Sequence, residues 1–342
     1  MKKILWSALG SMLAGAAALA LLPGQAEAQY SWKPDKPVTI IVPWAAGGST
    51  DQMARIVAGE LEAELKQKFV VVNQPGASGS VGTKNALEAA KDGYTWAAGA
   101  AVDVGTYKVL GLLDTMLADW ELFFAVANVN CIAVNPSTPY KDFGQLLAAL
   151  KKDGANVSVA TAGLSSAGHN YMESIVAADK AVKYKHVTYN GGAPAVTATV
   201  AGETQVVAQL LVEMSEHVKA KRLVPLACQT EKPVKLEGFG DIPAVTKWLA
   251  KMPAPLNYFG IWVPKTAPKS VVETMQAVWK NKMAKDAALQ KYADSRAALF
   301  APLYGKQAQD EAMKMVRYTA WLYFDAGKAK VKPDDLGIKR QN

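Results

Sequence analysis

The sequence has few cysteines, few histidines and no long block of charge of one sign. Two cysteines in 342 residues exclude a disulfide-rich scaffold and clustered cysteine metal sites, and the three histidines form no pair at metal-ligand spacing. Lys and Arg outnumber Asp and Glu by 38 to 30, but they are scattered. This scatter fits attraction of small anions better than a nucleic-acid surface, so we expect no metal, cofactor or nucleic-acid partner.

Long hydrophobic runs are also missing after the N-terminus. Lys2 and Lys3 precede an apolar run over residues 4–22, and Ala26-Glu27-Ala28 follows it. This pattern predicts a signal peptide over residues 1–28, cut after Ala28, and an exported, soluble mature protein. A retained membrane anchor is the alternative, because the run is almost long enough to cross a bilayer.

The two cysteines lie in apolar, strand-like stretches. Cys131 opens the run Cys-Ile-Ala-Val, and Cys228 ends Val-Pro-Leu-Ala-Cys. Cysteine is among the most buried residue types, so we expect two buried free thiols. A disulfide is the alternative, which an oxidising compartment allows.

Apolar strand-like runs alternate with stretches of helical spacing along the rest of the chain. Strands are predicted over residues 38–42, 69–72, 94–98, 157–160, 185–189, 204–211, 223–228 and 259–263. Helices are predicted over residues 51–66, 138–151, 169–178, 194–200, 268–284 and 306–325, and a short helix is predicted to follow the loop at residues 76–82 and to end near residue 90. Thr138 and Pro139 are predicted as cap and first turn of the helix at 138–151. Such repeated βα units predict an α/β fold of mostly parallel sheets with helices on both faces.

The order of these elements predicts two lobes. Residues 232–255 are rich in proline and glycine, and there we expect the chain to return from one lobe to the other. The first lobe is predicted from residues 29–128 plus 241–342, and the second from residues 129–240.

One loop stands out as a candidate anion site. After the strand at residues 38–42, Gly47 and Gly48 let the backbone approach a bound group, and a helix begins at Ser49 or Thr50. The first N–H groups of a helix lack internal partners and bind carboxylate or phosphate. The alternative is that the two hydroxyl residues only cap the helix and the glycines only turn. Trp44, inside the same loop, is predicted to form a pocket wall.

Two later segments repeat this arrangement. Residues 159–168 lead from a strand into a helix with Ser165 and Ser166 in its first turn, and residues 189–194 do the same with Pro194. If the strands are parallel, all three helix starts lie at the carboxyl edges of the sheets, where ligands of open α/β folds bind. They would suit a ligand with one or two carboxylates.

The sequence gives little support to an enzyme. In Gly163-Leu-Ser-Ser-Ala-Gly168, two residues separate Ser165 from the second glycine, where a nucleophile elbow requires one. We expect His169 to pack or hydrogen-bond inside its helix end, with a catalytic base as the alternative. The glycines at 76, 79 and 82 match neither the Walker phosphate loop nor the Gly-x-Gly-x-x-Gly pattern of dinucleotide-binding folds. An exported serine hydrolase using Ser165 or Ser166 is the enzymatic alternative.

Several blocks resemble the solute-binding proteins of tripartite tricarboxylate transporters, the Bug family of bacteria. These blocks are residues 34–51, 73–82, 92–95, 134–137, 165–169, 186–191 and 259–268, so the likeness spans nearly all of residues 33–340. The resemblance implies a two-lobed type II periplasmic binding protein of the Venus-flytrap kind, located in the periplasm and without enzymatic activity. It would pass carboxylates to membrane permease subunits, and we expect a monomer. A sensor subunit for a membrane kinase is the alternative.

The resemblance also implies where the ligand lies. The loop at residues 43–51 would contact it from lobe one, partly through water, and residues 161–169 and 189–192 from lobe two. The expected ligand-binding residues are Pro43, Trp44, Ala46, Gly47, Gly48, Ser49, Thr50, Asp51, Thr161, Gly163, Ser165, Ser166, His169, Tyr189, Gly191 and Gln209.

The chain departs from the family pattern at the binding loops. Members usually carry Phe where this chain has Trp44, and many carry aspartates where it has Gln205 and Gln209. An amide can donate to an anionic ligand that a carboxylate would repel. We therefore expect a small organic carboxylate, either a dicarboxylate or an aromatic carboxylate, without specifying which one.

Overall fold

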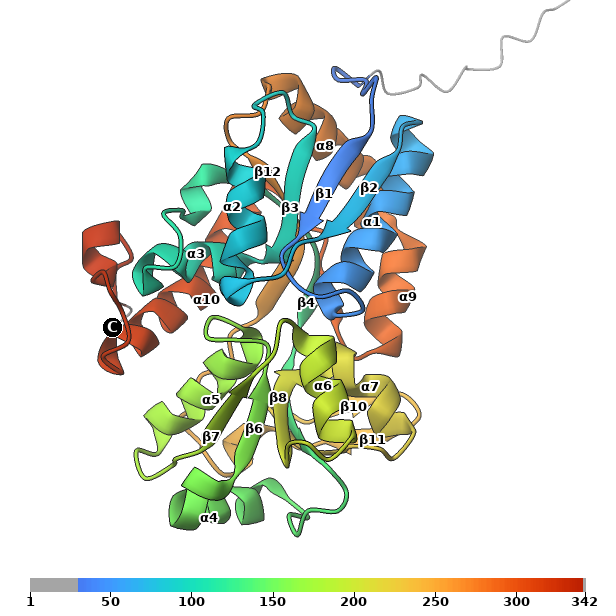
Figure 1. Ribbon diagram of the computed structural model, residues 1–342. Coiled ribbons are helices and arrows are strands. Elements are labelled where there is room, and N and C mark those ends of the chain that lie inside the picture. Colours follow the sequence, from blue (N-terminus) through green and yellow to red (C-terminus); the bar gives the residue numbers. More distant parts are fainter. Residues whose placement is uncertain (1–29, 341–342) are drawn as a thin grey trace, which may run out of the picture. The chain divides into compact units, whose positions relative to one another are not determined.

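The computed structural model describes residues 30–340, which from Ser31 onward form one compact unit (Figure 1). The predicted signal peptide, its cleavage site and Gln29 lie outside the described residues.

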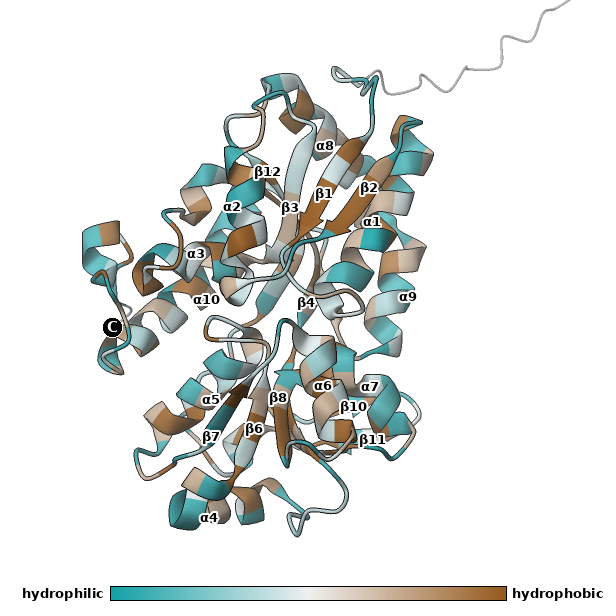
Figure 2. Cartoon of the chain, in the orientation of Figure 1, coloured by the Kyte–Doolittle hydropathy of each residue, from teal (hydrophilic) through white to brown (hydrophobic). Residues whose placement is uncertain are grey.

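The first lobe is built on a six-stranded sheet. Its strands lie in the order β13 (Leu299–Phe300), β4 (Trp120–Asn128), β12 (Asn257–Pro264), β3 (Thr95–Ala100), β1 (Val38–Val42) and β2 (Phe69–Asn73). Helices α2 (Ser80–Glu88), α3 (Ala101–Leu110) and α10 (Gly305–Asp325) lie on one side of it in Figure 1, and α1 (Ser49–Leu65) and α9 (Ala287–Ser295) on the other, with α8 (Lys269–Asn281) near β12. Figure 2 shows β1 and β2 as mainly hydrophobic, as expected of strands covered on both faces.

The second lobe is built on a five-stranded sheet. Its order is β7 (Lys185–Thr188), β6 (Ser158–Thr161), β8 (Val206–Leu210), β5 (Asn130–Val134) and β9 (Val224–Cys228). One face packs on α4 (Phe143–Asp153) and α5 (Ala167–Ala178), and the other on α6 (Gly192–Val200) and α7 (Leu211–Lys219). Successive side chains of β5 point to opposite faces of the sheet, as strand geometry requires. Ile132 packs in the core with α4 and α5, and Ala133 packs in the core with α6 and α7.

Shorter elements complete the chain. A two-stranded ribbon pairs β10 (Val234–Leu236) with β11 (Gly240–Ile242). Single helical turns, labelled η, occur at η1 (Ala77–Gly79), η2 (Leu117–Asp119), η3 (Gly154–Asn156), η4 (Val245–Lys247), η5 (Met283–Lys285) and η6 (Pro333–Leu336).

The chain crosses between the lobes where β4 passes almost directly into β5, and it returns before β12. Val245, Trp248 and Met252 still pack in the core of the second lobe. The core of the second lobe thus includes residues beyond 240, the position at which the sequence analysis predicted the lobe to end.

The two-lobed α/β architecture is confirmed, but the expectation of mostly parallel sheets is wrong. β1 pairs in parallel with β2 and β3, and β6 with β7 and β8. β12 pairs antiparallel with β3 and β4, and β5 with β8 and β9. The reason is that β5 and β12 each arrive from the other lobe, run against their neighbours and lie inside their sheets.

Local boundaries also differ from the sequence prediction. The helix expected from Thr138 begins at Phe143, because Asp142 caps it by accepting a hydrogen bond from the Gln145 amide at 2.9 Å. Helices α3, α7 and α9 were not predicted.

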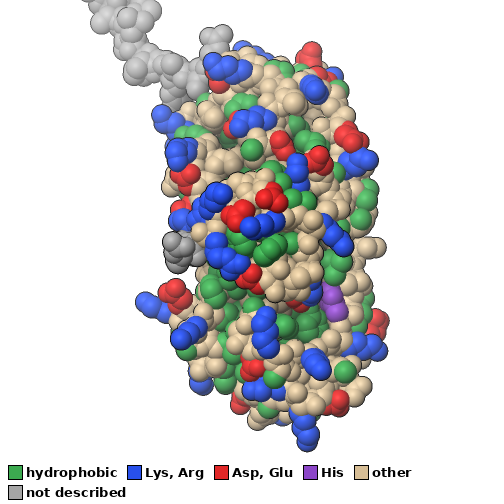
Figure 3. All heavy atoms as spheres, turned by 90° about the vertical axis from the view of Figure 1, so that its left-hand side faces the viewer, with side chains coloured by type: hydrophobic (Ala, Val, Ile, Leu, Met, Phe, Trp, Pro, Cys, Tyr) green, Lys and Arg blue, Asp and Glu red, His purple; other side chains and the backbone are tan. Residues whose placement is uncertain are grey.

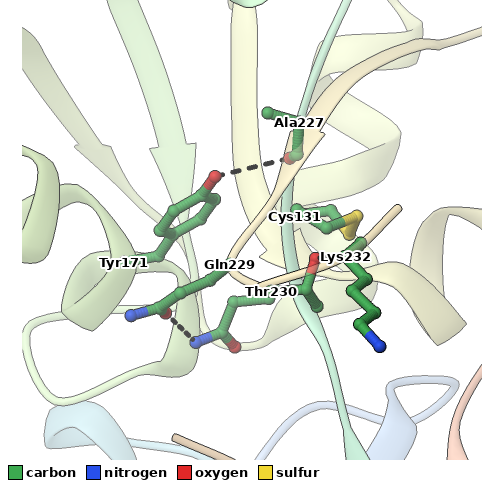
Figure 4. The surroundings of a disulfide bond; sticks show 8 residues. Cys131, Tyr171, Ala227, Gln229, Thr230 and Lys232 are labelled. Atoms are coloured by element: carbon green, nitrogen blue, oxygen red, sulfur yellow. Dashed lines mark hydrogen bonds between the residues drawn. A yellow bond between two sulfur atoms is a disulfide. The ribbon is translucent and has the colours of Figure 1, made fainter. Parts of the chain in front are cut away.

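Cys131 and Cys228 form a disulfide, so the expectation of free thiols is wrong. The antiparallel register of β5 and β9 places the two residues directly opposite each other, and both are fully buried (Figure 4). Nearby, the Tyr171 hydroxyl donates to the Ala227 carbonyl at 3.4 Å.

Candidate functional site

Five helices begin around one small cavity between the lobes. Helices α1 and α3 reach it from the first lobe, and α5, α6 and α7 from the second. Its lining residues are Trp44, Gly48, Ser49, Thr50, Ala100, Asp103, Ala162, Ser166, Ala167, Gly192, Gln209, Leu210, Glu213 and Phe259. The cavity holds about 30 Å³, room for only a water molecule or two, so a larger ligand requires the lobes or side chains to move.

Several predicted site residues line this cavity. They are Trp44, Gly48, Ser49, Thr50, Ser166 and Gln209. Ser49 and Thr50 are almost fully buried and form the first residues of α1. The helix starts predicted at Ser49 or Thr50, at residue 169 and at residue 194 lie at residues 49, 167 and 192. They come together at the cavity, as the strand edges require.

A carboxyl group from the opposite lobe occupies the start of α1. The Ser49 amide donates to Glu213 Oε1 at 2.8 Å, whereas the N-cap residue Gly48 has no side chain to do this. A side chain at Gly192 would overlap the Glu213 carboxyl, so that glycine leaves the space that the carboxyl fills. The start of α1 thus holds a carboxyl group in this structure.

Asp51, predicted to contact ligand, instead fixes its own loop. Its carboxylate accepts hydrogen bonds from the Gly47 amide at 2.9 Å, from Arg55 and from Asn73 at 3.0 Å. Burial raises the pKa of Asp51, but these hydrogen bonds outweigh it and hold the pKa below its ordinary value. Gly47, at φ +82°, makes the turn that brings its amide to this carboxylate.

The start of α5 is satisfied from within the second lobe. The Gly168 amide donates to Gln209 Oε1 at 3.0 Å, and Ser166 caps the helix by accepting from the His169 amide at 3.4 Å. A side chain at Gly168 would overlap the Ala208 carbonyl, so the helix start lies directly on β8. Gln205, the other departure from the family pattern, bonds to Ser158 and lies away from the cavity.

Other predicted residues join the two lobes rather than line the cavity. Leu164 donates its amide to Ser78 Oγ at 3.0 Å, and Ser165 Oγ donates to the Ser78 carbonyl at 3.0 Å. The Ala45 amide donates to the Asn190 carbonyl at 2.9 Å, beside Gly191. Pro43, Ala46, Thr161, Gly163 and Tyr189 also lie outside the lining.

His169 is fully engaged inside the protein. Its Nδ1 contacts the Leu164 carbonyl and the Tyr323 hydroxyl, its Nε2 lies 3.4 Å from Glu173 Oε1, and its ring stacks on His186. No ring nitrogen is left for a substrate, and His169 makes no contact with a serine hydroxyl except through its amide.

Glu173 is the ion-pair partner of His169, and its carboxylate should make the stability of the protein depend on pH. It also accepts from Lys328 at 2.7 Å. Burial raises the pKa of Glu173, but His169 and Lys328 outweigh it and bring the pKa to about 2. A pKa lowered on folding stabilises the native state above the ordinary carboxyl pKa of 4.5 and ceases to do so as the pH falls towards 2.

We therefore expect Glu173→Gln to lower the free energy of unfolding at pH 7 and to lose this deficit towards pH 2. Urea titrations of both proteins between pH 3 and 7 measure it. Glu273→Gln, in the exposed pair with Lys269, is the matched control and should change stability little at either pH. A deficit that stays constant with pH would contradict the role assigned to the Glu173 charge.

Sequence reasoning missed two acidic residues of the cavity, Asp103 and Glu213. Each is the third residue of a helix, α3 or α7, that follows a strand directly. Burial raises the pKa of both carboxyls, that of Glu213 to about 7, while a hydrogen bond from Trp44 partly opposes the shift at Asp103. An acid in the first turn after a buried strand was the signal that could have found them.

A larger groove of about 1090 Å³ lies away from these residues, between α5, residues 248–255 and α10. None of the predicted site residues lines it. Figure 3 shows basic and acidic side chains interspersed over one face of the molecule, with no continuous field of one sign there.

The described part of the chain offers neither a membrane-spanning helix nor a cluster of metal ligands. No helix within residues 30–340 is long and apolar enough to cross a bilayer. Within the same range, no three His, Cys, Asp or Glu side chains are grouped so that they could hold a metal ion.

Comparison with known proteins gives a consistent result. The sequence profile described as "Tripartite tricarboxylate transporter family receptor" matches residues 53–318. A UPF0065 protein of Pseudomonas sp. strain P51 is 29% identical over 71% of this chain and 73% of its own length. Protein BugT of Bordetella pertussis is 29% identical over 70% of this chain and 74% of its own.

Solved structures share the same architecture. A structure described as a periplasmic transporter is 26% identical, covers 86% of this chain and 98% of its own, and has a TM-score of 0.77. The periplasmic binding protein BugD is 24% identical, covers 86% and 99%, and has a TM-score of 0.79. These likenesses show the two-lobed fold of periplasmic binding proteins.

Proposed function

The chain belongs to the tripartite tricarboxylate transporter receptor family, and from this premise we propose that it captures a small organic carboxylate between its two lobes. It does so in the periplasm as a monomer and passes the ligand to the membrane permease subunits of such a transporter. The ligand is a dicarboxylate or an aromatic carboxylate.

One observation carries the carboxylate assignment. The first amide of α1 already donates to a carboxyl oxygen, that of Glu213, at 2.8 Å. A helix start favours negative charge through its unpaired N–H groups and its dipole. A ligand carboxylate that takes the place of Glu213 would meet the same donor, with the Thr50 and Ser166 hydroxyls nearby in the cavity lining.

The remaining lining suits the rest of such a ligand. Trp44 and Phe259 supply aromatic walls for an apolar middle, and the Gln209 amide offers a donor at the far end. Because the cavity is too small for an organic acid, the ligand enters when the lobes part and stabilises them when they approach again. The permease recognises the approached form.

The same geometry argues for binding rather than catalysis. Ser165 donates to a backbone carbonyl, and both ring nitrogens of His169 have partners inside the protein. A serine nucleophile requires a base within hydrogen-bond reach, and neither serine has one.

A thermal-shift screen of the mature protein against a panel of carboxylates tests the proposal. A ligand present at a hundred times its Kd stabilises the native state by about 2.7 kcal/mol, which raises Tm by roughly 3–8 °C. Sugars and amines without a carboxylate form the control panel. A rise with these compounds and none with any carboxylate would contradict the proposed ligand class.

A further inference from the structure

Two acidic residues line the cavity from opposite lobes. Asp103 comes from α3 in the first lobe and Glu213 from α7 in the second, and both belong to the lining. The Asp103 side chain is only 5% exposed, and its Oδ1 has no hydrogen-bond partner. Glu213 Oε2 is likewise buried and without a partner.

The other lining residues do not compensate these acids. Among the residues that line the cavity there is no lysine, arginine or histidine. A buried polar atom without a partner destabilises the folded protein, and a buried charge does so more strongly. Two such oxygens in one cavity therefore indicate a bound group that donates hydrogen bonds to them.

The surroundings hold both carboxyls in place. Glycines at 48 and 192 leave the space that the Glu213 carboxyl occupies, and Asp103 is buried in the first turn of α3. The two acids are thus built into the site rather than exposed on its rim.

A ligand with carboxylates alone would offer no hydrogen-bond donor to either oxygen, and it would add like charge beside an acid that is ionised. A ligand that carries both a carboxylate and an ammonium group supplies the missing hydrogen-bond donors and places a positive charge beside the two acids. Its carboxylate takes the Ser49 amide, which releases Glu213, and its ammonium then donates to Glu213 and Asp103 from the two lobes.

We infer that the solute is an aminocarboxylate, with its ammonium group held between Asp103 and Glu213. The inference rests on the proposed function and narrows its ligand class. Asp103 and Glu213 then determine specificity, because they distinguish an amino acid from the unsubstituted acid, and these two ligands differ only in the ammonium group.

Proton release provides an independent readout. Burial raises the pKa of both carboxyls, that of Glu213 to about 7, so Glu213 is partly protonated near neutral pH in the empty site. An ammonium group beside them favours the ionised form, so binding should release protons. Calorimetry in two buffers of different ionisation enthalpy measures this release.

The test compares acids with their amino derivatives by calorimetry on the mature protein. The pairs are succinate and aspartate, glutarate and glutamate, and 3-phenylpropionate and phenylalanine. For at least one pair we expect the amino acid to bind 10-fold or more tightly and with proton release. If the unsubstituted acids bind as tightly as the amino acids or more tightly, or if no amino acid binds, the inference is wrong. The proposed function is still supported in these cases whenever an unsubstituted acid binds. If only simple amines such as butylamine bind, the proposed function itself fails.

Two isosteric variants locate the effect. We expect Asp103→Asn and Glu213→Gln each to reduce the preference for the amino acid several-fold and to leave or improve binding of the unsubstituted acid. Asp286→Asn is the matched control, a buried carboxyl that caps α9 outside the cavity lining, and it should keep the full preference. Circular dichroism checks the fold of each variant, and either cavity variant alone decides the question if the other does not fold. A preference unchanged in a folded variant would overturn the assignment of that residue.

Discussion

Replacing Ser49 by proline is expected to weaken carboxylate binding about 10- to 100-fold while the protein remains folded. Proline removes the amide that donates to a carboxyl group at the start of α1. A hydrogen bond to a charged group contributes about 1.5–3 kcal/mol, and each 1.4 kcal/mol is tenfold in affinity. Calorimetric titration with a ligand from the carboxylate panel measures the loss.

The helix itself should tolerate this change. Ser49 is the first residue of α1, a position where proline is common because its N–H has no partner within the helix. The preceding Gly48 has the extended conformation that a residue before proline requires, with φ −74° and ψ 172°. Ser49→Ala is the control, since it removes the hydroxyl and keeps the amide. Equal affinity of Ser49→Pro and Ser49→Ala would show that the carboxylate does not use this donor.

Loss of the disulfide is expected to have the largest effect on stability. The bond joins residues 97 positions apart, and closing a loop of that length in the unfolded chain accounts for about 4–5 kcal/mol in the chain-entropy view. We expect a Cys131→Ala, Cys228→Ala double variant to unfold at clearly lower urea concentration than the parent, with a loss of about 2–5 kcal/mol.

Reductant provides the matched comparison. It should lower the stability of the parent protein and leave that of the double variant unchanged. Thiol titration of the denatured, unreduced protein should find no free thiol. Two free thiols, together with a parent protein insensitive to reductant, would contradict the disulfide.

The parts of the site that depend on short stretches of sequence were predictable. The glycine loop at residues 47 and 48, and the helix starts at Ser49 and Ala167, follow from a strand, a turn and a helix within about ten residues. The family resemblance is confirmed by the match over residues 53–318, and with it the two-lobed architecture.

The parts that depend on contacts distant in sequence were not predictable. Nothing near Glu213 indicates that its carboxyl reaches the amide of Ser49, 164 residues away. Asp103 was missed because α3 follows β3 without a turn, so the apolar pattern of strand and helix runs together. The disulfide depends on the register of β5 and β9, which neither cysteine's neighbourhood specifies.

The position of β12 determines the order in which the chain can complete its folding. This strand lies between β3 and β4, although more than 120 residues separate it from either in the sequence. The first sheet therefore cannot close until the end of the chain arrives, and contacts of such long range form slowly. The second sheet needs only residues 130–228, which include both cysteines, so it can assemble before the first sheet is complete.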